Sequence, residues 1–151
     1  SGNFTEKIIE INKPNKLHLI DTWSTKRYGQ NKFELVKNKF SKQINSGIIN
    51  ITRATSVEAA SSFKDNYFDW IYIDTDHSYS TTKKELLAYE KKIKVDGFIL
   101  GHDYVMGNWM KSGKYGVIEA VAEFCVSRNW KLIYWTADFT ENNSFAIQRI
   151  K

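Results

Sequence analysis

Residues 70–79 read WIYIDTDHSY and join a short apolar run to a dense polar cluster. An apolar run of this length, followed at once by polar residues, is typical of a strand buried in a parallel sheet. A helix is expected next, over residues 82–93, because Thr82 and Glu85 have the spacing of a capping box. A second apolar strand is expected over residues 98–100. Strand, helix and strand in this order predict a parallel βαβ unit.

The same alternation of strands and helices continues in both directions along the chain. The expected helices cover residues 5–11, 33–44, 57–63 and 117–126, and the expected strands cover residues 17–21, 48–52, 132–135 and 144–150. A turn is expected at Asp96-Gly97. Because no helix separates the last two strands, we expect them to form an antiparallel hairpin. The sequence therefore predicts a single α/β domain over residues 1–151, with a mostly parallel sheet and a C-terminal antiparallel hairpin.

The length and composition are those of one globular domain. The chain has 151 residues, of which 42% are hydrophobic and 26% are charged, and this balance argues against a disordered chain. No run of about 18 apolar residues occurs, so neither a membrane helix nor a membrane partner is expected. The single cysteine, Cys125, excludes an internal disulfide and a cysteine-cluster zinc site, and it is compatible with a cytoplasmic location. We expect Cys125 to pack against the core.

The positive charge of the chain does not follow a nucleic-acid-binding pattern. The net charge is +5, but only four of the 22 basic residues are arginine, the residue that makes bidentate contacts to phosphate and guanine. The lysines are scattered, and the pairs at residues 83–84 and 91–92 lie on one expected helix, where a solvated face is the simpler interpretation. The sequence therefore does not favour nucleic acid as a partner.

Acidic residues end three of the expected strands, at Asp21, Asp74 and Asp103. Each one alone fits turn or capping chemistry. However, ligands of open parallel sheets bind outside the carboxyl ends of the strands. Carboxylates that converge there repel one another unless a cation or a donor compensates them. A divalent metal that prefers oxygen ligands would provide that compensation.

Two histidines accompany these acids. His77 follows Asp74 by three residues, and His102 directly precedes Asp103. Because histidine titrates near neutrality, His77 suits a general base or a metal ligand, with an exposed loop histidine as the alternative. The position of His102 supports a site shared by both loops. His18 lies inside an expected strand, and we expect it to be structural.

Two segments of the chain carry a family resemblance. IDTDHSY at residues 73–79 and DGFILGHDY at residues 96–104 resemble the class I S-adenosylmethionine-dependent methyltransferases. The similarity is to the small-molecule O-methyltransferases of that class, which include enzymes acting on sugars of natural products, and it extends over about residues 2–151. The resemblance implies a Rossmann-like sheet, S-adenosyl-L-methionine as the cofactor, and a hydroxyl of a small molecule, such as a sugar, as the methyl acceptor.

The resemblance also assigns contacts to the cofactor. Asp21 matches the acid that accepts hydrogen bonds from the ribose hydroxyls, and Thr22 and Trp23 follow it along the ribose and adenine. Ser56 matches the loop near the adenine, where Arg53 departs from the acidic or small residue that is common in the family. The other cofactor-binding residues that the resemblance implies are Gly2 and Asp74.

Some relatives, such as the catechol-type and caffeoyl-coenzyme-A-type O-methyltransferases, depend on a metal. They carry an acid after the fourth strand, matched by Asp74, and an acid–amide pair after the fifth, matched by Asp103 with Tyr104 or shifted to His102 and Asp103. The resemblance thus implies Mg²⁺ or another divalent metal on Asp74, Asp103 and His102, which would hold and acidify the substrate hydroxyl. His77 stands where these relatives place a lysine as general base.

The chain begins inside the glycine-rich motif that opens the family's domain. Gly2 matches the last glycine of that motif, so we expect an N-terminally truncated chain without the first strand. In the family this strand lies between the strands that end here at Asp21 and Asp74. Those two strands could pair directly, accept a strand from a neighbouring chain, or leave a wet gap, and we expect one of the first two outcomes. We expect low stability, association into a homo-oligomer and weak cofactor binding.

Two other functions are compatible with the sequence. A domain of the same fold could bind ligands without turnover, which a missing first strand favours. A nucleic-acid methyltransferase would be expected to carry a motif of the Asn-Pro-Pro-Tyr type after the fourth strand, where residues 74–77 read DTDH instead. Within the loop over residues 104–115, Trp109 and Met110 could form a lid or pack on the surface.

Overall fold

The computed structural model describes residues 2–108, 113–137 and 142–151. The interpretation of Trp109 and Met110 therefore lies outside the described residues. The chain divides into two compact units, Ser1–Ala59 and Ala60–Lys151, which we describe separately. Within the described ranges, no helix has the length and apolar character needed to cross a membrane.

The first unit is a two-stranded parallel sheet with helices. Its elements are α1 (Asn3–Asn12), β1 (Leu17–Asp21), α2 (Gln30–Lys39), α3 (Ser41–Asn45), β2 (Ile49–Arg53) and α4 (Ser56–Ala60), whose last residue begins the second unit. β1 and β2 pair from Leu17 and Ile49 to Asp21 and Arg53. Val36, Phe40 and Ile49 form the buried centre of this unit. The strand expected over residues 17–21 is confirmed without any shift of its ends, and His18 lies half-buried within it.

The single helix expected over residues 33–44 is wrong, because the chain leaves the helical conformation at Phe40. This residue has φ of −106° and ψ of 21° and separates α2 from α3. Its ring is only 3% exposed and packs with Val36 and Ile49. Phe40 thus contributes a large aromatic side chain to the core at the break, and burial of that apolar surface stabilises the fold.

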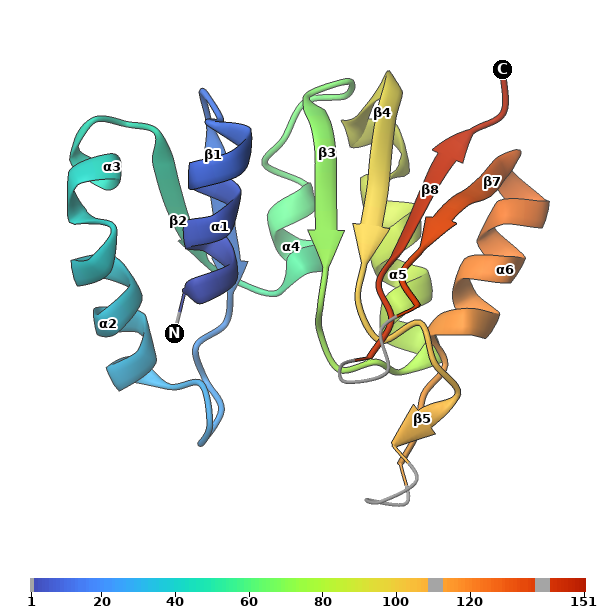
Figure 1. Ribbon diagram of the computed structural model, residues 1–151, viewed down its shortest axis with the longest axis horizontal. Coiled ribbons are helices and arrows are strands. Elements are labelled where there is room, and N and C mark those ends of the chain that lie inside the picture. The colour runs from blue at the N-terminus through green and yellow to red at the C-terminus, as the bar shows by residue number, and fades with distance from the viewer. Residues whose placement is uncertain (1, 109–112, 138–141) are drawn as a thin grey trace. The chain divides into compact units, whose positions relative to one another are not determined.

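The second unit contains a four-stranded sheet in the order β3-β4-β8-β7 (Figure 1). Its elements are β3 (Phe68–Ile73), α5 (Tyr79–Tyr89), a 3-10 turn η1 (Glu90–Lys92), β4 (Ile93–Gly101), β5 (Gly107–Asn108), β6 (Gly113–Lys114), α6 (Val117–Arg128), β7 (Trp130–Trp135) and β8 (Phe145–Arg149). β3 and β4 are parallel, whereas β8 runs antiparallel to both β4 and β7. The expected α/β architecture with a C-terminal antiparallel hairpin is confirmed.

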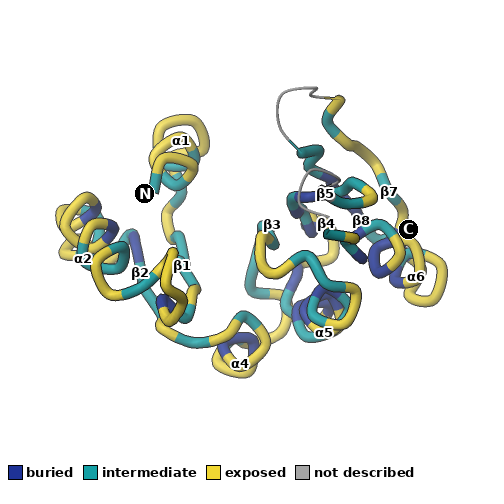
Figure 2. The backbone as a smooth tube through the Cα atoms, turned by 90° about the horizontal axis from the view of Figure 1, so that it is seen from below, coloured by how far each residue is buried: buried dark blue, intermediate teal, exposed yellow. Residues whose placement is uncertain are grey.

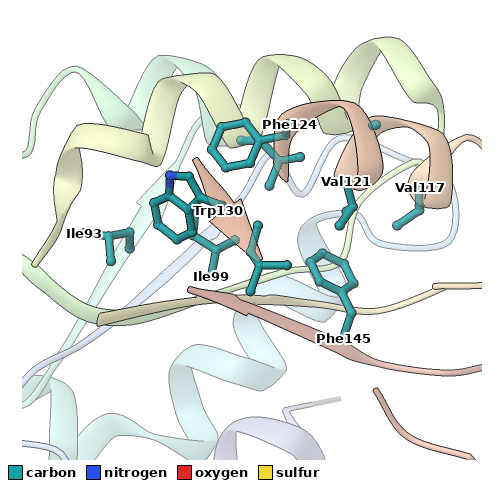
Figure 3. Close-up of a cluster of buried hydrophobic side chains, with 10 residues drawn as sticks. Ile93, Ile99, Val117, Val121, Phe124, Trp130 and Phe145 are labelled. Atoms are coloured by element: carbon teal, nitrogen blue, oxygen red, sulfur yellow. The ribbon is translucent and has the colours of Figure 1, made fainter. Parts of the chain in front are cut away.

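The core of this unit lies between the sheet and the helices α5 and α6. Figure 3 shows part of it, where Val121 and Phe124 of α6 meet Ile99 of β4, Trp130 of β7 and Phe145 of β8. The opposite side of α6 is exposed in Figure 2. Cys125 packs against this core as expected, and its burial raises the pKa of the thiol.

Two sequence expectations in this unit are wrong at the level of single residues. α5 begins after Ser78, whose hydroxyl accepts the Thr81 backbone N–H at 3.2 Å. Thr82 and Glu85 are instead buried inside the helix and form no capping box. The turn expected at Asp96-Gly97 is also wrong, because β4 continues through it. Gly97 makes this continuation feasible, since a Cβ there would lie 2.6 Å from the Asp69 carbonyl oxygen.

In the first unit β1 has β2 as its hydrogen-bonded neighbour, and in the second unit β3 has β4. The consequences expected from a missing first strand stay predictions. The short antiparallel ribbon of β5 and β6 was not expected from the sequence.

Candidate functional site

The candidate site lies in the second unit, at the carboxyl ends of β3 and β4. These parallel strands are in register at Ile73 and Gly101, so the loops that follow them leave the sheet side by side. The His102 backbone N–H donates to the Ile73 carbonyl oxygen at 2.9 Å and ties the two loops together. This position agrees with the rule that ligands of open α/β sheets bind at the carboxyl ends of strands.

Asp103 is the centre of the cluster. Its carboxylate is buried, and its Oδ2 atom lies 2.8 Å from His77 Nδ1 and 3.2 Å from His102 Nδ1. Its Oδ1 atom accepts a hydrogen bond from the Asn142 side-chain amide. One oxygen of this buried carboxylate therefore accepts a hydrogen bond, and the other lies within ion-pair distance of two imidazoles, so both have polar partners inside the protein. The two loops and the segment just before the last strand therefore meet on one side chain.

His77 also contacts the segment that precedes α6. Its ring packs on that of Tyr115 with centroids 4.7 Å apart, and its carbonyl oxygen accepts the Gly116 backbone N–H at 2.9 Å. Gly116 lies against Tyr79, where an added Cβ would come within 2.4 Å of the Tyr79 Cβ. The segment that leads into α6 thus holds the loop after β3 in place.

Asp74 completes a group that could bind a metal. One potential ligand atom from each of Asp74, His102 and Asp103 lies within 4.8 Å of the others. Although Asp74 retains solvent exposure as a residue, protein atoms around its carboxyl group raise the pKa, and the nearby Asp103 charge adds to this while His102 and His77 oppose it. The structure therefore brings together the three residues that the sequence assigned to a metal, while their binding of a metal stays a prediction.

Neighbouring side chains complete the surroundings of the site. A small pocket is lined by Ile73, Thr75, His77, Thr82, His102, Val117 and Phe145. The Thr75 hydroxyl donates to the buried Glu85 carboxylate at 3.0 Å, which anchors the loop to α5. The Tyr72 hydroxyl lies 2.9 Å from Ser144 Oγ; burial raises the pKa of Tyr72, the Ser144 contact opposes this, and the charges of Asp74 and Asp103 add to it.

Sequence reasoning missed Tyr115 and Asn142. Asn142 lies just before β8, which is antiparallel to β4 and pairs Phe145 with Gly101. An antiparallel strand begins at the edge where its parallel neighbours end. The expected hairpin therefore contained the signal that residues just before residue 145 would reach the site. Tyr104, at the position of the amide ligand in metal-dependent relatives, instead packs on Phe145 at a centroid distance of 5.5 Å.

The residues assigned to the cofactor's ribose and adenine lie in the first unit. Asp21 is exposed, and its Oδ1 atom accepts the Trp23 backbone N–H at 2.7 Å. Trp23 is buried and packs edge-on against Phe33 at 5.2 Å. Arg53 lies over the ring of Phe33, with its guanidinium carbon 4.8 Å from the ring centroid. The structure brings Asp21 and Trp23 together in one turn.

The other assigned residues in this unit have local structural roles. Thr22 accepts a hydrogen bond from the Ser24 hydroxyl at 2.9 Å. Ser56 is the first residue of α4. Gly2 precedes α1 with φ of 75°, and an added Cβ would lie 2.8 Å from Phe40 Cε2. The cofactor contacts of these residues stay predictions.

Comparison with known proteins identifies the family and the fold. Residues 1–104 match the family model described as a methyltransferase domain. No curated protein matches the sequence of this chain.

Solved structures share the fold at low sequence identity. They include a proposed rRNA methylase of Clostridium thermocellum (12% identity, TM-score 0.70, covering 99% of this chain and 82% of that chain). An O-methyltransferase family protein of Burkholderia thailandensis is similar over 98% of this chain and 48% of its own (9% identity, TM-score 0.69). A methyltransferase of Geobacter sulfurreducens is similar over 90% of this chain and 59% of its own (10% identity, TM-score 0.62). The chain spans 47% to 62% of the length of several such relatives.

Proposed function

This chain belongs to the family of methyltransferase domains, and on that premise we propose that it transfers a methyl group from S-adenosylmethionine to a hydroxyl of a small molecule. The observation that carries the proposal is the contact of His77 Nδ1 with the buried Asp103 carboxylate, 2.8 Å away, at the carboxyl ends of β3 and β4. A histidine held against a carboxylate is suited to accept a proton near neutral pH.

The residues of the chain would act mainly on the acceptor. When bound, the cofactor supplies an electrophilic methyl group on a sulfonium. His77 would remove the proton of the acceptor hydroxyl as the oxygen attacks, while the imidazolium charge that forms is compensated by Asp103. The contacts of His77 with Tyr115 and Gly116 would hold its ring in place, and positioning is a large part of the catalysis of a reaction between two bound molecules.

The group of Asp74, His102 and Asp103 fits a divalent metal in its chemistry. Two carboxylates and one imidazole suit Mn²⁺, Zn²⁺ or Fe²⁺ at least as well as Mg²⁺, which prefers oxygen ligands alone. The raised pKa of Asp74 would be lowered again by a cation, which compensates carboxylates that repel each other. A bound metal would supply Lewis-acid activation of the acceptor hydroxyl.

A small-molecule acceptor, sugar-like or catechol-like, is favoured over nucleic acid. The loop after β3 carries Asp74 and His77, which suit the activation of a hydroxyl. The basic residues remain dominated by lysine, with four arginines in the chain. A cytoplasmic location and a homo-oligomeric state belong to the same proposal, and cell fractionation and light scattering test them.

Methyl transfer from S-adenosylmethionine labelled in its methyl group tests this function. The probes are catechol and a panel of monosaccharides, each with EDTA or with Mg²⁺ or Mn²⁺. We expect label in a hydroxyl acceptor, and His77→Ala should lower the turnover number about 10²–10⁴-fold while His18→Ala leaves it unchanged. Label in RNA but in no small molecule would favour the nucleic-acid alternative. Cofactor binding without transfer to any acceptor would favour a binding domain without turnover.

A further inference from the structure

We propose that Asp103 and Asn142 act as positioning residues that hold His77 as the tautomer with its proton on Nδ1. The basic lone pair is then on Nε2, the atom that would receive the acceptor's proton. This inference rests on the proposed role of His77, and it assigns functions to an aspartate that the sequence linked only to a metal and to an asparagine that the sequence did not single out.

The first step is the chemistry of the contact between His77 and Asp103. An ionised carboxylate has no proton and can only accept hydrogen bonds. His77 Nδ1 lies 2.8 Å from Asp103 Oδ2, where a lone pair on this nitrogen would repel the carboxylate, so Nδ1 carries the proton. A neutral imidazole carries one N–H, and the other nitrogen then has a free lone pair. The contact therefore selects the Nδ1–H tautomer and leaves Nε2 as the base.

The second step is the fixation of the carboxylate itself. Asp103 is 4% exposed, and its Oδ1 atom accepts the Asn142 amide while Oδ2 faces the two histidines. Asn142 thus sets the plane of the carboxylate and directs Oδ2 towards His77. His102 lies further from the same oxygen, at 3.2 Å, so His77 has the shorter contact.

The third step is that the backbone of both residues is held for this contact. His77 and Asp103 have φ of 61° and 58°, in the left-handed region that residues other than glycine rarely adopt. Tyr115 and Gly116 fix the ring and the carbonyl group of His77. Such strained positions persist where surrounding contacts impose them, often at functional sites.

Metal binding by the neighbouring group is compatible with this arrangement. Carboxylates that ligate a metal commonly accept hydrogen bonds as well, which orient them. During transfer the acceptor's proton would move to Nε2, the Nδ1 proton would stay in place, and the imidazolium would remain next to Asp103. The Asp103 carboxylate would then both contact His77, the proton acceptor, and serve as one of the metal ligands.

Nitrogen-15 NMR of the imidazole rings tests the proposal without cofactor or acceptor. Correlation spectra of the ring nitrogens, recorded at pH 8 in EDTA and again with Mg²⁺, distinguish a protonated nitrogen from an unprotonated one. The chain has three histidines, so His18→Gln, His77→Gln and His102→Gln assign the signals. We expect His77 to show a protonated Nδ1 and an unprotonated Nε2 in both conditions, and to keep this pattern in His102→Gln.

Two variants test the positioning residues. Asp103→Asn should shift His77 towards the Nε2–H tautomer that predominates in free histidine, as should Asn142→Leu to a smaller extent. Asn143→Leu is the matched control, because the Tyr104 N–H bonds the main-chain carbonyl of Asn143, which the substitution keeps. A wild-type His77 protonated on Nε2 would overturn the proposal even if the variants failed to fold.

The two proposals can fail independently. If His77 has the expected tautomer but the protein transfers no methyl group, the proposed function is wrong while the role of Asp103 and Asn142 stands. If methyl transfer occurs with His77 protonated on Nε2, the positioning proposal is wrong. An unchanged His77 pattern in both Asp103→Asn and Asn142→Leu would also reject it.

Discussion

His77 and Asp103 contact each other through Nδ1 and Oδ2, and both residues hold their backbone in the left-handed region, with φ of 61° and 58°. For residues other than glycine this conformation typically costs about 1–3 kcal/mol each. The contact joins the loops after two neighbouring strands, so the strain is maintained by tertiary structure and not by the local sequence.

A pair of substitutions at His77 tests this strain. Both His77→Gly and His77→Ala remove the imidazole and its contact with Asp103, but only glycine adopts positive φ without cost. We expect His77→Gly to be more stable than His77→Ala by about 1 kcal/mol, measured by urea denaturation in EDTA.

The same pair at Lys84 is the control. This residue is exposed inside α5, where glycine is about 1 kcal/mol less favourable than alanine. The order of stability should therefore reverse. Equal stability of the two His77 variants would mean that the left-handed backbone at this position is not strained.

The strands were the most predictable part of the fold. The apolar runs at residues 17–21 and 70–73 are short and bounded by polar residues, which is the pattern expected of buried strands, and the structure has strands there. The start of α5 depends on a local contact, the Ser78 cap, whereas the break between α2 and α3 comes at Phe40, whose side chain is buried in the core. Asp96-Gly97 has turn chemistry, yet β4 continues through it with a register shift against β3 between the pairs Phe68–Ile93 and Trp70–Phe98, and Gly97 fits there because a Cβ would lie 2.6 Å from the Asp69 carbonyl oxygen.

The candidate site was predictable to the extent that it lies on the parallel strands. Asp74, His77, His102 and Asp103 follow β3 and β4, and parallel strands bring their carboxyl ends together. Asn142 and Tyr115 come from segments distant in sequence, whose approach depends on the antiparallel position of β8 and the packing of α6. The specific link between His77 and Asp103 could not be derived either, since it needs two left-handed residues.

The Cys125 thiol should react slowly in the folded protein. It packs against the core, and its burial raises its pKa, which reduces the fraction of reactive thiolate at neutral pH. We expect alkylation by iodoacetamide at pH 7.5 to be roughly tenfold or more slower in the native state than in guanidinium.

An exposed cysteine one residue further provides the comparison. Val126 is 89% exposed on the same helix, so the double variant Cys125→Ala, Val126→Cys should be alkylated at a rate close to that of the unfolded chain. If Cys125 reacted as fast as this variant, our assignment of Cys125 to packing would be incorrect.

Cofactor affinity should depend on Asp21. Asp21→Ala removes the acceptor assigned to the ribose hydroxyls, and hydrogen bonds to a charged group contribute about 1.5–3 kcal/mol. We expect weaker binding of S-adenosylmethionine by about 10–100-fold, measured by calorimetry. Asp21 has two roles, the proposed contact of its charged carboxylate with the ribose and the hydrogen bond from the Trp23 N–H. Asp21→Asn separates them, because it removes the charge while its amide oxygen can still accept the Trp23 N–H.

Asp69→Ala is the control for the loss of one negative charge. Asp69 is an exposed carboxylate of β3 that pairs with Lys94 at 2.6 Å, and its removal should leave cofactor affinity unchanged. Unaltered binding in Asp21→Ala would show that the ribose is recognised elsewhere.

Metal affinity should depend on Asp74, His102 and Asp103 together. Their potential ligand atoms lie within 4.8 Å of one another, so each of Asp74→Asn, His102→Gln and Asp103→Asn removes a donor from the same group. We expect each substitution to weaken Mn²⁺ binding by at least about 10-fold, since even residues that only orient metal ligands contribute 10–100-fold. The electron paramagnetic resonance signal of free Mn²⁺ measures the affinity directly. Asp76→Asn is the matched control, because Asp76 is two residues from Asp74 but its oxygens accept the Ser78 N–H and the Thr81 hydroxyl. A loss in Asp76→Asn as large as in Asp74→Asn would indicate a diffuse attraction by negative charge instead of a defined site.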